Sequence, residues 1–153
     1  MGTEVNDSLF SGLNLNTYVE PQVFKDGEEV SVRILDAELK TGIGRENGKP
    51  WANLQLVLQP INFEGKSDKD DKDMLNPKII YYPIWLPTPE STVKQINSSK
   101  GYIKKVYDMI GEYPADGVPK REDFLGKEMG IVTKLDTTGP EPKNEVRKLV
   151  KAA

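Results

Sequence analysis

The stretch NPKIIYYPIWLP, residues 76–87, is the most apolar run in a chain that is otherwise rich in charge. If it forms a β-strand, successive side chains point to opposite faces. One face then carries Ile80, Tyr82, Ile84 and Leu86. The other carries Ile79, Tyr81 and Trp85. A strand of a small antiparallel sheet normally turns one face to the core and the other to solvent, so the second apolar face requires a partner outside the core.

Pro83 lies in the middle of this run. A proline has no N–H to donate and is found in sheets at an edge, at a strand end or at a bulge. We therefore expect the strand to be irregular near its middle. The assignment of Tyr81 and Trp85 to one face depends on the strand continuing past this proline.

The segment VSVRILDAELK, residues 30–40, has the period of a strand, but its apolar residues change parity. The first set is Val30, Val32 and Ile34, and the second is Leu35, Ala37 and Leu39. We predict a β-bulge or a strong bend between Ile34 and Leu35 that re-aims the core-facing side chains. Such a bend is typical of a long strand that wraps around a small barrel.

Asn47-Gly48 separates this strand from WANLQLVLQP, residues 51–60, and predicts a tight hairpin turn. The inward face of the second strand is expected to be Ala52, Leu54, Leu56 and Leu58. The outward face is expected to be Trp51, Asn53, Gln55, Val57 and Gln59.

One later segment has a helical period, carried by Ile103, Val106, Tyr107 and Ile110. Ser98 or Ser99 can cap its start, and Gly111 can close its end. The preceding residues 91–96 are expected to form a separate short turn. Two strands follow the helix, KEMGIVTKLD at residues 127–136 and NEVRKLVKA at residues 144–152.

The order of elements is therefore three strands, a helix and two strands, with the first strand bent. This order predicts a mainly β domain with one main α-helix: a five-stranded Greek-key barrel of the OB-fold type, with the helix between strands three and four. We expect residues 1–27 to form a partly flexible N-terminal arm and residues 28–153 to form the domain, with a charged loop at residues 62–77. The acids of that loop lack calcium-loop spacing, because Asp73 stands where the turn glycine is required.

The 153 residues include no histidine and no cysteine. Histidine is the usual general base near neutral pH, and both residue types are common metal ligands. Their absence excludes Ser-His and Cys-His nucleophiles, His-based metal sites and disulfides. The predicted strands also carry no convergent set of acids, so we expect no enzyme activity, no cofactor and no bound metal.

The chain has no apolar run close to the roughly 18 residues that a membrane span requires. Its first residues do not have the basic and then apolar character of a signal peptide. Together with the lack of cysteine, these features lead us to expect an intracellular protein with no membrane partner.

A protein that binds single strands without sequence preference needs aromatic platforms for bases and positive charges for phosphates. Trp51, Tyr81 and Trp85 lie on the outward parity of the second and third strands, the pair that forms the usual OB-fold binding face. The cationic candidates lie on the first strand, the hairpin and the last two strands: Arg33, Lys40, Arg45, Lys49, Lys134, Arg147 and Lys148.

The net charge of −3 is unevenly distributed. Residues 1–30 hold one lysine and six acids, which gives net −5. The following segments carry +1 over residues 31–60, −1 over residues 61–98 and +2 over residues 99–153. The predicted barrel is therefore nearly neutral, which permits a local basic groove and predicts a modest, salt-sensitive affinity for a polyanion.

The succession VRILDAELK, GKPWANLQLVLQ, an apolar third strand, a helix, FLGKEMGIVTKLD and KNEVRKLV resembles a family of small bacteriophage proteins regarded as single-stranded-DNA-binding OB-fold proteins. The closest-matching pieces are residues 124–127, which lead into the fourth strand, and residues 144–146, which lead into the fifth. The similarity covers roughly residues 28 to 151. The chain departs from that family in its long charged loop and in its C-terminus, KLVKAA, which lacks the acidic tail of many such proteins.

This resemblance implies a protein that coats replication or recombination intermediates in the cytoplasm of an infected bacterial host. Single-stranded DNA would be its ligand, and phage or host replication and recombination proteins would be its partners.

The aromatic residues also admit another interpretation. Trp51 and Trp85 can pack against the helix, the arm or a second subunit, since exposed apolar patches also mark protein interfaces. The alternative is a protein-interaction module or virion component that uses the same face to bind protein, and a homodimer is left open.

Overall fold

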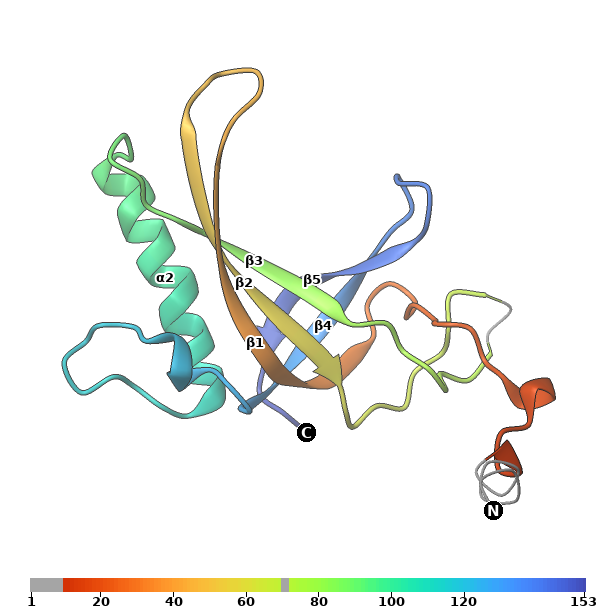
Figure 1. Ribbon diagram of the computed structural model, residues 1–153. Coiled ribbons are helices and arrows are strands. Elements are labelled where there is room, and N and C mark those ends of the chain that lie inside the picture. Colours follow the sequence, from red (N-terminus) through yellow and green to blue (C-terminus); the bar gives the residue numbers. More distant parts are fainter. Residues whose placement is uncertain (1–9, 70–71) are drawn as a thin grey trace, which may run out of the picture.

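The structure, a computed structural model, describes residues 10–69 and 72–153 (Figure 1). Five antiparallel strands form one sheet in the spatial order β3-β2-β1-β4-β5. The strands are β1 (Glu29–Ile43), β2 (Pro50–Pro60), β3 (Ile80–Leu86), β4 (Glu128–Asp136) and β5 (Lys143–Val150). The described residues also form one α-helix, α2 (Val93–Ile110), and the 3-10 turns η1 (Leu15–Thr17) and η2 (Arg121–Asp123). The chain is thus mainly β with one main helix, as predicted.

A β-bulge lies near the middle of β1. The register of β1 against β2 shifts between Ile34 and Asp36, so Leu35 is the extra residue. Ile34 is buried before the bulge and Ala37 is buried after it, which confirms the predicted change of parity. The expectation that Leu35 and Leu39 face the core is wrong, because they are 46% and 68% exposed. Leu35 is left unpaired by the bulge, and Leu39 lies beyond the stretch of β1 that β4 covers.

The predicted hairpin joins β1 and β2 through residues 44–49. Gly48 has a φ of 64°, a left-handed conformation that glycine adopts without steric cost. The Gly44 N–H donates to the Lys49 carbonyl at 2.9 Å and closes the loop. Leu54, Leu56 and Leu58 of β2 are buried as the alternation predicts, while Ala52 is half-buried.

Within the described residues the hydrogen-bonded sheet is open between β3 and β5, so the closed barrel that we expected does not form. The two strands lie close together, but no ladder joins them. Pro83 gives a physical reason. Pro83 lies opposite Gln55 of β2. Hydrogen-bonded residue pairs alternate along β1 and β2, starting from the pair Gly44 and Lys49, so Gln55 belongs to a pair that is bonded to β1. The backbone N–H and C=O of Gln55 therefore point toward β1 and away from Pro83. The Pro83 nitrogen therefore points toward β5 and has no hydrogen to donate.

The helix α2 begins earlier than its apolar period indicates. Thr92 and Gln95 form a capping box: the Thr92 hydroxyl accepts from the Gln95 N–H, and the Gln95 side chain accepts from the Thr92 N–H. The expectation of a separate short turn before a cap at Ser98 or Ser99 is therefore wrong. Gly111 ends the helix with a φ of 76°, as predicted.

The core includes side chains from outside the strands and the helix. Phe24, from the segment before β1, is fully buried, and Met74, from the charged loop, is 6% exposed. The Asn144 side chain holds Phe24 by accepting from its N–H at 2.7 Å and donating to its carbonyl at 3.0 Å. Residues 1–9 of the predicted arm and residues 70–71 of the charged loop lie outside the described part of the chain.

Candidate nucleic-acid interface

Two tryptophans contact each other on the outer face of β2 and β3. The rings of Trp51 and Trp85 lie edge to face, with centroids 6.1 Å apart and an interplanar angle of 86°. Trp51 also lies against the backbone of Gly42 on β1, since a Cβ at Gly42 would stand 2.5 Å from Trp51 Cζ2. Trp85 remains 61% exposed, so a broad aromatic surface is open to solvent.

Tyr81 lies on the same face of β3, toward the other end of the strand. The alternation continues through Pro83, because Ile80 and Ile84 are buried while Tyr81 and Trp85 are exposed. β3 pairs with β2 through Pro83 without a register shift, so the expected irregularity near its middle is wrong, and the predicted assignment of Tyr81 and Trp85 to one face is confirmed. Tyr81, which is 51% exposed, therefore extends the aromatic face along the strand.

The N-terminal half of α2 fixes the end of β3. Ser99 is 7% exposed, and its hydroxyl donates to the Trp85 carbonyl at 2.7 Å. In the turn that leads from β3 into the helix, the Thr88 N–H donates to the Ser91 hydroxyl at 2.8 Å. These bonds hold the backbone of Trp85 against α2 and thereby position its indole relative to the helix.

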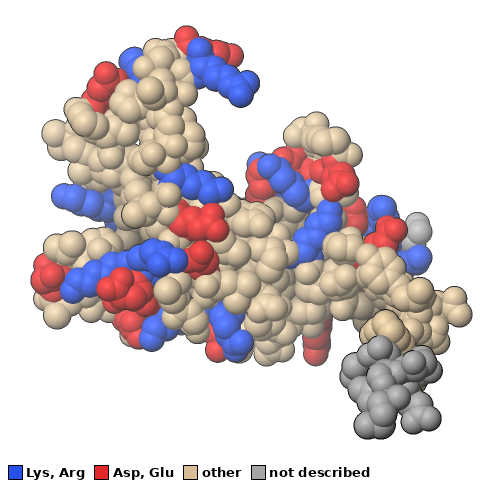
Figure 2. Space-filling model, in the orientation of Figure 1, with Lys and Arg blue, Asp and Glu red and all other residues tan. Residues whose placement is uncertain are grey.

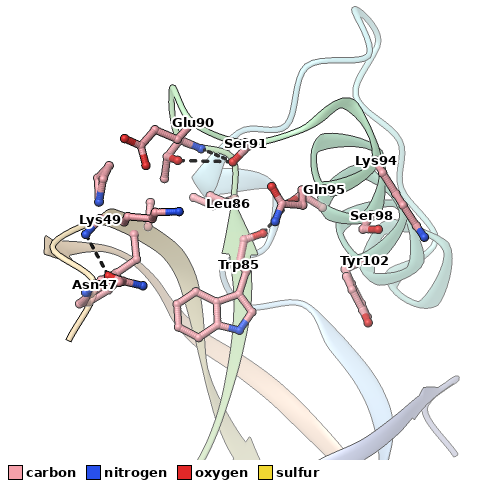
Figure 3. Close-up of a pocket in the computed structure, with 15 residues that line it drawn as sticks. Asn47, Lys49, Trp85, Leu86, Glu90, Ser91, Lys94, Gln95, Ser98 and Tyr102 are labelled. Atoms are coloured by element: carbon pink, nitrogen blue, oxygen red, sulfur yellow. Dashed lines mark hydrogen bonds between the residues drawn. The ribbon is translucent and has the colours of Figure 1, made fainter. Parts of the chain in front are cut away.

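A groove of about 530 Å³ lies between the β1–β2 hairpin, the end of β3 and the first half of α2. We call it the hairpin–helix groove. Figure 3 shows Trp85 between the hairpin, which carries Lys49, and the helix, which carries Lys94 and Tyr102. With Trp51 and Glu90, the groove combines three aromatic side chains with two lysines and one carboxylate.

Five residues of the hairpin–helix groove come from α2, and their place in it was not foreseen from the sequence: Lys94, Gln95, Ser98, Ser99 and Tyr102. Lys94, Ser98 and Tyr102 are spaced four residues apart, which places them on one face of a helix. That face becomes visible only when the helix begins at Val93 rather than after Ser99. The sequence signal for this start was the Thr-x-x-Gln capping motif.

The predicted cations fall into two groups. Three already have carboxylate partners: Arg33 with Glu128 and Lys40 with Glu38, both at 3.7 Å, and Arg147 with Asp26. Four others have no ion pair within the part of the chain that the structure describes: Arg45, Lys49, Lys134 and Lys148. Figure 2 shows acidic and basic side chains interspersed over the face in view, without one continuous basic patch.

The unpaired cations are spread over two hairpins. Arg45 and Lys49 lie in the loop between β1 and β2, whereas Lys134 and Lys148 lie on β4 and β5. The β1–β2 and β4–β5 hairpins project from the same side of the molecule, with a hollow between them (Figures 1 and 2). Only Lys49 of these four lines the hairpin–helix groove as the structure describes it.

Arg147 has a structural role. The Leu135 N–H, and then Arg147 itself, lower the pKa of Asp26 below its usual value of 3.8. Asp26 therefore stays ionised and ties β5 and the end of β4 to the turn before β1. Tyr82 packs against the core, where burial raises the pKa of its hydroxyl and the nearby Tyr102 adds to this shift, so the hydroxyl stays neutral.

Asn53 lies opposite Lys40 on β1 and opposite Trp85 on β3. It is 7% exposed, and its side-chain carbonyl oxygen has no hydrogen-bond partner among the described residues. Buried polar groups are nearly always paired in folded proteins. The aromatic face therefore contains an acceptor that the fold itself does not use.

No group of three or more acids in residues 10–69 and 72–153 could hold a metal ion. No helix within these ranges is both long and apolar enough to cross a bilayer.

The chain matches no protein-family model and no curated protein. What the face offers chemically is aromatic surface for stacking, together with a small number of unpaired cations.

Proposed function

We propose that this chain is a sequence-tolerant single-stranded-DNA-binding protein of bacteriophage type, without enzyme activity. It would coat replication or recombination intermediates in the cytoplasm of the infected host. Phage or host replication and recombination proteins would be its protein partners.

The arrangement of the strands supports an OB-fold for this function. The bent β1 pairs with β2 along most of its length and with β4 over its first residues. β3 approaches β5, and α2 stands between β3 and β4 in the chain. These are features of the OB-fold, which is a partly open barrel. The missing hydrogen-bond ladder between β3 and β5 is therefore compatible with it.

The observation that carries the proposal is the exposed tryptophan pair beside the hairpin–helix groove. Aromatic side chains whose rings are exposed on the outer face of β2 and β3 can stack against bases, which contributes about 1–3 kcal/mol per base. Stacking accepts every base, so this chemistry gives affinity without sequence preference. Trp85 would be the main platform, with Trp51 and Tyr102 at the same groove and Tyr81 further along β3.

The unpaired cations would follow the phosphates. Lys49 and Lys94 line the groove on opposite sides, and Arg45 lies in the hairpin loop. Three phosphate contacts would give a slope of about −2 for the logarithm of the association constant against the logarithm of salt concentration. The expected affinity is therefore modest and moderately sensitive to salt.

Tryptophan fluorescence tests this function directly. Titration of the full chain with oligo-dT at low salt should quench the emission of Trp51 and Trp85 and should shift the mobility of the oligonucleotide. The quenching should require more oligonucleotide as salt is added. Absence of both quenching and mobility shift at low salt would contradict the proposal.

The alternative function is a protein-interaction module or virion component that uses the same face. The ion pairs of Arg33, Lys40 and Arg147 favour it, because they leave a largely apolar face with few free charges. This alternative predicts that oligo-dT leaves the fluorescence unchanged while the protein still binds another protein through Trp85.

A further inference from the structure

Among the strands and helices that the structure describes, α2 carries the most positive charge. Its acidic and basic residues are four lysines and one aspartate, which gives net +3: Lys94, Lys100, Lys104, Lys105 and Asp108. β5 follows with net +2, while β1 and β4 carry −1 each. The chain as a whole carries −3, so positive charge is concentrated on the helix that forms one wall of the hairpin–helix groove.

Three of the four lysines of α2 have no ion pair within the described residues. Lys104 pairs with Asp108 at 3.6 Å, one turn further along the helix. Lys94, Lys100 and Lys105 are exposed, and no described carboxylate lies within ion-pair distance of them. Their charges are therefore free to meet an anionic ligand.

Two of the unpaired lysines lie on the face of α2 that forms the groove. At 3.6 residues per turn, Lys94 and Lys105 differ by about 20° around the helix axis and by about 16 Å along it. Ser98 and Tyr102 follow Lys94 along the helix on this face, and all three line the groove (Figure 3). Lys100 lies about 140° away from Lys105 around the axis. Lys105 thus continues the face of the groove toward the C-terminal half of the helix.

Tyr102 gives this face an aromatic surface between the two cations. Its side chain is 57% exposed. It lies three residues before Lys105, a spacing that makes two side chains neighbours on a helix surface. A single strand requires such a combination, because its phosphates need positive charge and its bases need a stacking surface. The helix therefore offers the chemistry of the aromatic face outside the sheet.

We propose that single-stranded DNA leaves the hairpin–helix groove along this face of α2, which we call the α2 track (Lys94, Ser98, Tyr102 and Lys105). Lys94 binds a phosphate at the groove, a base stacks on Tyr102, and Lys105 binds a phosphate further along the strand. The inference rests on the proposed function and extends its site from the outer face of β2 and β3 onto the helix. The contact at Lys105 adds about −0.7 to the salt slope of about −2 that the three contacts at the groove give.

Lys105→Ala tests the α2 track, and Lys100→Ala is the matched control. Both variants remove one exposed, unpaired lysine from α2, and only Lys105 lies on the track. Oligo-dT of about 16 nucleotides, the upper end of the usual site size, is titrated against each full-length protein at several salt concentrations. Lys105→Ala should weaken binding about fivefold at low salt and make the salt slope shallower by about 0.7. Lys100→Ala should keep the slope of the unmodified chain, and Lys105→Arg should restore it.

The outcomes separate the α2 track from the proposed function. If the unmodified chain binds oligo-dT and all the variants share its affinity and slope, the track is wrong while the groove remains the binding site. Equal losses in Lys105→Ala and Lys100→Ala would show a general effect of charge and would also overturn the track. Absence of binding by the unmodified chain would overturn both the track and the proposed function.

Discussion

Gly42 determines how Trp51 lies, because any side chain at this position would occupy the space of the indole. We expect Gly42→Ala to move the Trp51 ring away from Trp85, since the new Cβ would stand 2.5 Å from Trp51 Cζ2. The free energy of unfolding should fall by about 1 kcal/mol, as in mild overpacking. The affinity for oligo-dT should fall by about fivefold, within the value of one stacked base.

Near-UV circular dichroism reports the movement of the ring, urea unfolding gives the free energy of unfolding, and fluorescence titration gives the affinity for oligo-dT. Gly12→Ala is the matched control, because a Cβ at Gly12 meets no heavy atom within 4 Å. If the tryptophan spectra of Gly42→Ala equal those of the control, Trp51 does not pack on Gly42 as described.

Asp36 makes the bulge of β1 sensitive to acid. The Ala37 N–H, and then the Arg121 guanidinium, hold the pKa of Asp36 below its usual value of 3.8. A lowered pKa in the folded chain gives stability that is present above about pH 3.8 and is lost as the pH falls through the folded value. We expect Asp36→Asn to reduce the loss of unfolding free energy between about pH 5 and pH 2.

Urea unfolding at several pH values checks this expectation. The slope of the unfolding free energy against pH should be shallower in Asp36→Asn than in the unmodified chain. Identical slopes would show that the Asp36 carboxylate does not stabilise the bulge.

At the level of elements, the contact between α2 and β3 depends on Ser99. Ser99→Ala removes the 2.7 Å bond to the Trp85 carbonyl, so the free energy of unfolding should fall by about 1 kcal/mol. Oligo-dT affinity should also fall, because the end of β3 is no longer held against the helix. Ser98→Ala is the neighbouring control, since the Ser98 hydroxyl has no hydrogen bond within the described chain. Equal stability of the two variants in thermal unfolding would rule out this role of Ser99.

The sheet was largely predictable because the burial of alternate side chains is a local property of each strand. The bulge at Leu35 was visible for the same reason, as a local change of parity. The start of α2 was missed because its first half faces the groove with polar side chains, so the apolar period begins only at Ile103. The missing ladder between β3 and β5 could not be predicted, since the edge toward which the Pro83 nitrogen points depends on the register of the other strands.

The candidate site was predictable in its aromatic part and not in its charges. The parity of β3 alone places Tyr81 and Trp85 on one face. The carboxylate partners of Arg33 and Arg147 come from distant parts of the sequence, so only the folded chain shows that these cations are paired.

At the scale of the whole molecule, the net charge is −3 and the acidic and basic side chains are interspersed (Figure 2). These charges favour base stacking over phosphate contacts as the main source of the proposed affinity for single-stranded DNA. The two projecting hairpins leave a hollow between them in the face shown in Figure 2. Binding of a single strand would therefore depend chiefly on the aromatic face and less on the total charge.

The affinity of Trp85→Ala for oligo-dT at low salt, measured beside the unmodified chain and Tyr18→Ala, tests the aromatic face most directly. Trp85 and Tyr18 are similarly exposed, at 61% and 68%, so both variants should stay folded, and Trp85→Ala should lose about 1 kcal/mol of unfolding free energy with its ring contact to Trp51. We predict that Trp85→Ala binds about tenfold more weakly, the value of one stacked base, and that Tyr18→Ala binds like the unmodified chain. Equal affinities of all three proteins, or no binding by the unmodified chain, would contradict the proposed single-strand-binding face.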